Sequence, residues 1–179
     1  LYSAQSWTEL DEALAALQRG DGEQILNIFD NYVERNPDGS YSNVLQAETA
    51  VNCLDLPSPT VAQLEADAAQ VLQLAPTFGV ADLLSEIQCA AWPVAATGKA
   101  APLSAVGAPP ILVVGTTGDP VTPYTWAQAL AKELSSGVLL TREGLGHTAY
   151  GASSCIDSYV DAYLIKLRVP APGIVCPSD

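Results

Sequence analysis

Two short apolar segments restrict the folds open to this chain more than any other feature. Residues 110–115 and 137–141 are dominated by Val, Leu and Ile and are bounded by Pro or Gly, a pattern typical of strands buried on both faces. A helix is expected after each, the first with Thr122 as N-cap and Pro123 as first residue, the second over about residues 154–167. Alternating strands and helices indicate a parallel α/β sheet. Two strands are too few for a complete parallel sheet, so we expect the fold to be incomplete in this sequence.

Residues 1–100 have the patterns of helices and none of a strand. Two capping boxes of the form S/T-x-x-E/Q precede apolar residues at helical spacing, Ser6 with Glu9 and Thr60 with Gln63. A further helix is expected over about residues 43–53. The change of pattern near residue 100 divides the chain into a predicted helical region, 1–100, and a predicted α/β segment, 101–179.

The charge of the chain is strongly negative and unevenly distributed. The 179 residues include 20 Asp and Glu against 7 Lys and Arg, a net charge of −13. Because phosphate binding needs clustered cations, no nucleic-acid partner is expected. Residues 1–100 hold 14 acids and 3 bases, whereas residues 101–179 hold 6 and 4. Residues 100–118 carry no charge, but the prolines in this stretch argue against a membrane-spanning helix, and no transmembrane segment is expected.

Four cysteines and a single histidine constrain the cofactors and the compartment. No C-x-x-C pair is present, so we expect no zinc site, no other metal and no cofactor. The thiols are either free and buried or joined in two disulfides, for which three pairings exist. We favour Cys53–Cys89 and Cys155–Cys176, because each closes a loop within its own half of the chain.

Disulfides predict an exported, extracytoplasmic protein. The chain starts at Leu1 with neither an initiator Met nor a basic leader, so its start is interpreted as a cut.

Asp119 and His147 are the candidate chemical groups. Asp119 follows the first predicted strand and lies between Gly118 and Pro120, and His147 follows the second strand directly after Gly146. Each has a purely structural alternative, an Asp that serves only its turn and a structural His. Because parallel strands end at one edge of a sheet, the two loops together favour an acid–base pair. Acid before His is also the chain order of the α/β-hydrolase triad.

Several motifs of the carboxyl-terminal half form a specific combination. They are Gly118-Asp119-Pro120-Val121-Thr122-Pro123, Gly146-His147-Thr148, Cys155 with Tyr163-Leu164, and Pro172 with Cys176. Together they resemble the carboxyl-terminal domain of the exported tripeptidyl aminopeptidases of actinobacteria, a family that also includes mycobacterial cell-envelope serine proteases and carboxylesterases. The resemblance implies a bacterial protein that is secreted or held in the cell envelope. Ala50-Val51-Asn52-Cys53 and Cys89-Ala90-Ala91-Trp92-Pro93 are similar to the helical lid of this family. The resemblance implies the carboxyl-terminal portion of an α/β-hydrolase fold, preceded by an all-helical lid over residues 1–100.

The resemblance also implies a missing nucleophile. The family carries its serine on a G-x-S-x-G-like elbow upstream of the lid, and this chain has no such motif. Residues 151–155 contain serines but follow His147 and open a helix, so they are not an elbow. Asp119 and His147 would therefore complete a triad with an upstream serine-bearing segment, and the chain alone would be inactive.

The implied substrate is a peptide with a free N-terminus, which is cut to release tripeptides. A carboxylate is the natural partner of the peptide's ammonium group. Glu48 is the first choice, because Glu48 to Cys53 resembles the lid segment of the family, and Asp55 is the reserve. Three alternatives stay open: the acidic region is only a solvated surface, the substrate is an ester as in carboxylesterases and lipases, or the chain is a non-catalytic binding module.

Overall fold

The chain divides into two units in a computed structural model that describes residue 2 and residues 4–178. One unit joins Leu1–Gly22 to Pro102–Asp179, and the other is Glu23–Ala101. The second unit ends next to the predicted boundary at residue 100, whereas the first 22 residues group with the α/β segment. The assignment of residues 1–100 as a lid stays a prediction.

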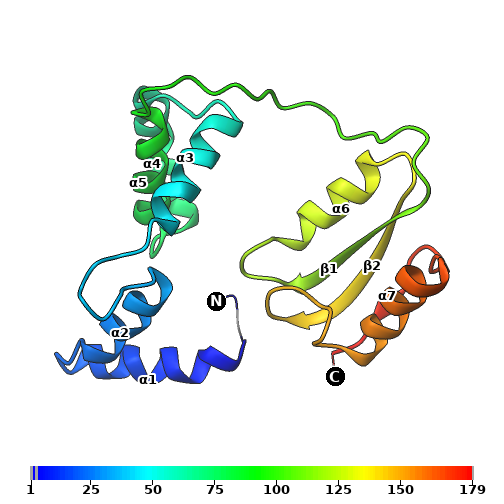
Figure 1. Ribbon diagram of the computed structural model, residues 1–179, viewed down its shortest axis with the longest axis horizontal. Coiled ribbons are helices and arrows are strands. Elements are labelled where there is room, and N and C mark those ends of the chain that lie inside the picture. The colour runs from blue at the N-terminus through cyan, green and yellow to red at the C-terminus, as the bar shows by residue number, and fades with distance from the viewer. Residues whose placement is uncertain (1, 3, 179) are drawn as a thin grey trace. The chain divides into compact units, whose positions relative to one another are not determined.

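The first unit contains a parallel sheet of three strands in the order β1-β2-β3. Along the chain its elements are β1 (Ile111–Gly118), α6 (Tyr124–Glu133), β2 (Gly137–Leu145), α7 (Ser154–Lys166) and β3 (Val175–Cys176), as Figure 1 shows. The α/β class predicted from the sequence is confirmed. The number of strands was predicted wrongly, because the two residues of β3 are too few to produce a periodic pattern.

Helices α6 and α7 cover opposite faces of this sheet. Leu112 and Val114 of β1 pack with Ile156 of α7 in a core that includes the fully buried Leu140. The next residue, Gly115, faces α6, where an added Cβ would lie 2.7 Å from the Cβ of Ala127. Successive strand residues point to opposite faces, so a sheet covered on both sides requires the apolar runs seen in the sequence.

The start of α6 differs from the prediction. The helix begins at Tyr124, and its N-cap is Pro123, which makes no side-chain capping hydrogen bond. Thr122 is therefore not the N-cap. Its hydroxyl donates to the carboxylate of Asp119 instead, so the side chain that the helix pattern assigned to capping serves the preceding loop.

The other helices are short and vary in how they begin. They are α1 (Trp7–Gln18), which follows the 3₁₀ helix η1 (Ala4–Ser6), and then α2 (Glu23–Tyr32), α3 (Val44–Asp55), α4 (Val61–Leu74) and α5 (Gly79–Ala90). The capping box of Thr60 and Gln63 is confirmed at α4. The one predicted at Ser6 is wrong, because the backbone of Ser6 is already helical and its side chain makes no capping hydrogen bond. Helix α5 was not predicted.

Two disulfides join the cysteines in the favoured pairs. Cys53–Cys89 links α3 to α5, and Cys155–Cys176 links the first turn of α7 to β3. Cys176 is completely buried in the core beside α7. The second disulfide therefore holds the shortest strand of the sheet against the helix that covers it.

Removing the disulfide of the α/β unit is expected to destabilise it measurably. The double variant Cys155→Ala with Cys176→Ala opens a loop whose ends are 21 residues apart in the sequence. For a loop of this length, the entropy of loop closure predicts a loss of about 3 kcal/mol in the free energy of unfolding. Urea unfolding under oxidising conditions measures this loss against the oxidised wild type, in which both disulfides are formed. An unchanged unfolding midpoint would contradict the expectation.

Candidate active site

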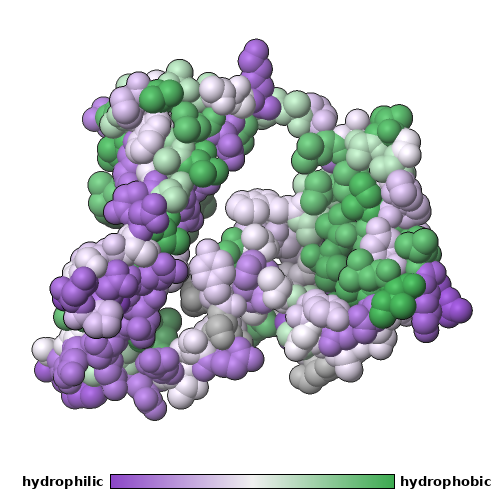
Figure 2. All heavy atoms as spheres, viewed as in Figure 1, coloured by the Kyte–Doolittle hydropathy of each residue, from purple (hydrophilic) through white to green (hydrophobic). Residues whose placement is uncertain are grey.

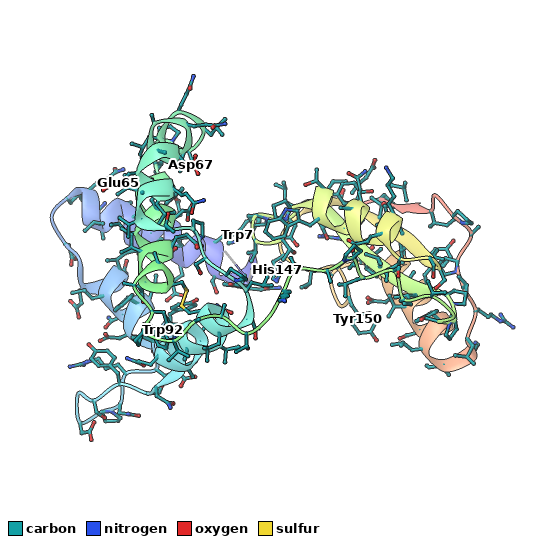
Figure 3. All side chains as sticks on the ribbon, turned by 90° about the horizontal axis from the view of Figure 1, so that it is seen from above. Trp7, Glu65, Asp67, Trp92, His147 and Tyr150 are labelled. Atoms are coloured by element: carbon teal, nitrogen blue, oxygen red, sulfur yellow. A yellow bond between two sulfur atoms is a disulfide. The ribbon has the colours of Figure 1, made fainter. Side chains whose placement is uncertain are left out.

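The site lies where β1 and β2 end. The two strands pair in parallel from Ile111 opposite Gly137, and after a shift in register Gly118 lies opposite Leu145. The N–H of Gly146 donates to the carbonyl of Gly118 at 3.2 Å, which joins the two loops just beyond the strands. Asp119 and His147, the next residue in each loop, therefore leave the sheet side by side, and Figure 3 labels His147 in its loop.

Asp119 and His147 are in direct contact, as the order of strands and loops predicted. The imidazole Nδ1 lies 3.0 Å from Oδ2 and 3.1 Å from Oδ1 of the carboxylate. The side chain of Asp119 is 4% exposed and that of His147 is 19% exposed. The acid is thus shielded behind the imidazole, while the ring keeps access to the surface.

Four further donors hold the Asp119 carboxylate. Oδ1 accepts from the backbone N–H groups of Val121 and Thr122, both at 2.8 Å. Oδ2 accepts from the Thr122 hydroxyl at 2.9 Å and from the N–H of Thr148 at 3.2 Å. Burial alone would raise the pKa of Asp119, but the hydrogen bonds from Thr122, Val121 and His147 outweigh it and hold the pKa well below its ordinary value. The carboxylate is therefore ionised at neutral pH.

An ionised carboxylate fixes the tautomer of His147. It can only accept hydrogen bonds, so Nδ1 must carry the proton that points at Asp119. In the neutral ring Nε2 is then the free base. The ring of Tyr2 packs edge-on against the imidazole, with 5.3 Å between ring centroids and 83° between planes. The arrangement can accept a proton at Nε2 and stabilise the resulting imidazolium through Asp119.

Two threonines at the end of β1 hold the histidine loop. The hydroxyl of Thr116, a residue only 2% exposed, donates to the carbonyl of Thr148 at 3.0 Å. Thr148 has a φ of +64°, an uncommon conformation for a non-glycine residue. Thr117 Oγ1 accepts from the N–H of Gly144 at 3.1 Å. The Thr116 contact thus holds the residue whose N–H donates to Asp119, and the Thr117 contact holds the end of β2 before the loop.

The sequence patterns did not single out the threonines of this site. Thr116 and Thr117 end an otherwise apolar strand, and this change from apolar to polar was the available signal. Thr122 was assigned to the helix cap. Its sequence context held the signal: Asp119 is followed by Pro120, which has no N–H to donate. The next two amides, those of Val121 and Thr122, are then the ones that can turn back to the carboxylate.

The two candidate residues for substrate binding lie in the other unit. Glu48 and Asp55 are exposed on α3, and a spacing of seven residues places them on one face of that helix. In the described part of the chain, neither carboxylate has an ion-pair partner. Their role in binding stays a prediction.

The described residues offer no other obvious centre for chemistry. Within residues 2 and 4–178 there is no group of three or more His, Cys, Asp and Glu placed to hold a metal ion. No helix in the same residues has the length and apolar character to cross a membrane.

An acid and a histidine at the ends of consecutive parallel strands, with helices on both faces of the sheet, match the positions of the acid and the base in the α/β-hydrolase class. Sequence comparison agrees and gives the family. The family model described as "TAP-like protein" matches residues 75–176, and the chain belongs to this family of α/β hydrolases.

Curated relatives carry three kinds of name. The chain is 38% identical over 183 residues to "Carboxylesterase B" and 37% identical over 181 residues to "Serine protease Hip1", both of Mycobacterium tuberculosis, and 26% identical over 179 residues to "Tripeptidyl aminopeptidase" of Streptomyces lividans. Each match covers 98% of this chain but 35%, 35% and 33% of the relative, respectively. The chain thus spans about a third of the length of these proteins, all of which are named as hydrolases.

Proposed function

We propose that this chain supplies the acid and the base of a Ser-Asp-His triad in an extracytoplasmic hydrolase. The observation that carries the proposal is the contact between the shielded Asp119 carboxylate and Nδ1 of His147, which leaves Nε2 as the base. His147 takes the proton of the serine during attack and returns it to the leaving group, while Asp119 holds the tautomer and stabilises the imidazolium. The two disulfides favour an oxidising compartment.

The serine is proposed to come from an upstream segment, which also supplies the oxyanion hole. Three features support this: the sequence has no serine elbow, the relatives are about three times as long, and β1 pairs only with β2 in the described sheet. A largely apolar groove of about 430 Å³ borders β1, where Gly115 and Trp126 line it together with Asp119. Trp126 is 63% exposed, and Figure 2 shows hydrophobic residues gathered on the visible face of this unit. A parallel strand beside β1 would cover this apolar edge.

The proposed substrate is a peptide with a free N-terminus. The relatives named as a tripeptidyl aminopeptidase and as a serine protease favour it. In this proposal Glu48, with Asp55 as the alternative, binds the ammonium group of the peptide. The acidic composition of residues 1–100 is the feature that would favour a cationic end.

Kinetics on matched substrates test this proposal. With tripeptide anilides, the full-length protein is expected to prefer a free N-terminus over an acetylated one. Glu48→Gln should raise KM for the free peptide about 10- to 100-fold, the range for losing a charge-assisted hydrogen bond, with little effect on the acetylated one. Glu65→Gln, which alters an exposed acid on α4, is the matched control. Equal rates on free and acetylated peptides would overturn the aminopeptidase proposal.

An ester substrate is the second candidate. The relative named Carboxylesterase B has an identity to this chain as high as that of the named protease, and acyl transfer to serine serves both substrates. Adding p-nitrophenyl esters to the same assay separates them. If esters are hydrolysed and neither peptide is, the esterase assignment replaces the peptidase assignment with the same catalytic residues.

A further inference from the structure

We propose that Thr122 is a positioning residue for the catalytic pair. Its hydroxyl fixes the rotation of the Asp119 carboxylate and thereby the aim of the His147 ring. The inference rests on the proposed triad and adds to it a residue that never touches the reacting atoms.

Thr122 contacts both oxygens of the carboxylate. Its N–H donates to Oδ1 at 2.8 Å, and its hydroxyl donates to Oδ2 at 2.9 Å. Oδ2 is also the oxygen closest to Nδ1 of His147, at 3.0 Å. The final torsion of an Asp side chain is broad, so its rotation is set by hydrogen bonds rather than by torsional preference. One residue bonded to both oxygens is well suited to set that rotation.

The protonation of His147 determines which atom accepts the hydrogen bond from the Thr122 hydroxyl. Thr122 Oγ1 lies 3.4 Å from Nδ1 and 2.9 Å from Oδ2. Nδ1 already carries a proton directed at the carboxylate, so the single hydroxyl proton goes to Oδ2. The Thr122 hydroxyl and the Nδ1–H of His147 therefore converge on Oδ2 together with the N–H of Thr148. Of these three donors, the Thr122 hydroxyl is the nearest to Oδ2 and holds that oxygen in place for the imidazole.

The place of Thr122 in the fold favours this role over a structural one. Its side chain is exposed, so no core packing requires the hydroxyl. Helix α6 begins at Tyr124 with Pro123 as its N-cap, so Thr122 lies one residue before the capping position and makes no capping bond. The hydroxyl is directed to the acid instead of to the helix.

Two substitutions at this position isolate the hydroxyl. Thr122→Val removes it and keeps the branched shape, whereas Thr122→Ser keeps it and removes the methyl group. Both keep the backbone N–H that donates to Oδ1. Thr125→Val, which alters an exposed threonine in α6 outside the site, is the matched control. Each variant is made in the full-length protein, and kcat, KM and thermal unfolding are measured.

Thr122→Val is expected to lower kcat about 10- to 100-fold at unchanged KM, the range for losing a hydrogen bond to a charged group. Thr122→Ser should restore kcat to within about 3-fold, and Thr125→Val should match wild type. The far-downfield proton resonance of the Nδ1–H···carboxylate bond should shift or broaden in Thr122→Val and return in Thr122→Ser. A purely structural role would alter thermal unfolding and leave that resonance in place.

The result that overturns the inference is a Thr122→Val protein with wild-type kcat and resonance, or a Thr122→Ser protein as impaired as Thr122→Val. Asp119→Asn, measured in parallel, separates this failure from that of the triad. If Asp119→Asn is inactive and Thr122→Val is fully active, only the positioning role fails. If Asp119→Asn is fully active, the proposed triad itself fails.

Discussion

Replacing His147 by Gln in the full-length protein is expected to lower kcat by about 10⁵- to 10⁶-fold. The proposed base is Nε2 of this ring, and no second histidine is present in the chain to replace it. Triads act as a unit, so losing the base removes nearly all of the rate that the triad supplies. Steady-state kinetics on a peptide anilide measure the loss, because acylation itself is blocked.

The loss of kcat can be assigned to catalysis only if the His147→Gln protein is folded. His147 is part-exposed, and Gln can still donate to the Asp119 carboxylate, so thermal unfolding should change little. Affinity for a non-hydrolysable peptide analogue should also be retained. A variant that keeps more than about a tenth of wild-type kcat would refute the assignment of His147 as the base.

The elements predicted correctly were those whose pattern is local. The apolar runs at β1 and β2 must be covered on both faces, which is why their composition alone indicates a parallel sheet. The pairing of Asp119 with His147 followed from that topology, because parallel strands bring their carboxyl ends to one edge. The disulfide pairs followed from short separations along the chain.

The elements that were missed do not share a single cause. β3 consists of two residues whose pairing with Thr141 and Arg142 lies outside any local window. Helix α5 was also missed. It packs closely on α4, since a Cβ added at Gly79 would lie 3.0 Å from the side chain of Val71. Thr122 satisfied a local rule for helix caps, and the nearby carboxylate took its hydroxyl instead. A threonine between an acid and a helix can donate to the carboxylate or accept from a backbone N–H of the helix, and sequence spacing alone did not decide between the two.

Replacing Asp119 by Asn is expected to lower kcat by about 10⁴-fold at neutral pH. An amide in this place offers N–H donors as well as an oxygen, and the neighbouring backbone N–H groups will hold the oxygen. The NH₂ group then faces Nδ1, which must accept, so the proton moves to Nε2 and the base is lost. Asp67→Asn, the same change at an exposed acid of α4, is the matched control and should leave kcat unaltered. Wild-type rates in Asp119→Asn would show that the acid does not set the tautomer.

The same variant tests the electrostatics of the site through stability. Hydrogen bonds hold the pKa of Asp119 below its ordinary value of about 3.9. A depressed pKa in the folded state contributes stability above the pKa of the unfolded chain, and this stability is lost as the pH falls through the folded pKa. Wild type should therefore be more stable than Asp119→Asn at pH 5–7, and the difference should shrink steadily as the pH falls below about 4. Urea unfolding midpoints across that range measure the difference, with Asp67→Asn again as control. A difference that does not change with pH would mean that the hydrogen bonds around Asp119 do not favour its ionised form, and the proposed tautomer of His147 would lose its physical basis.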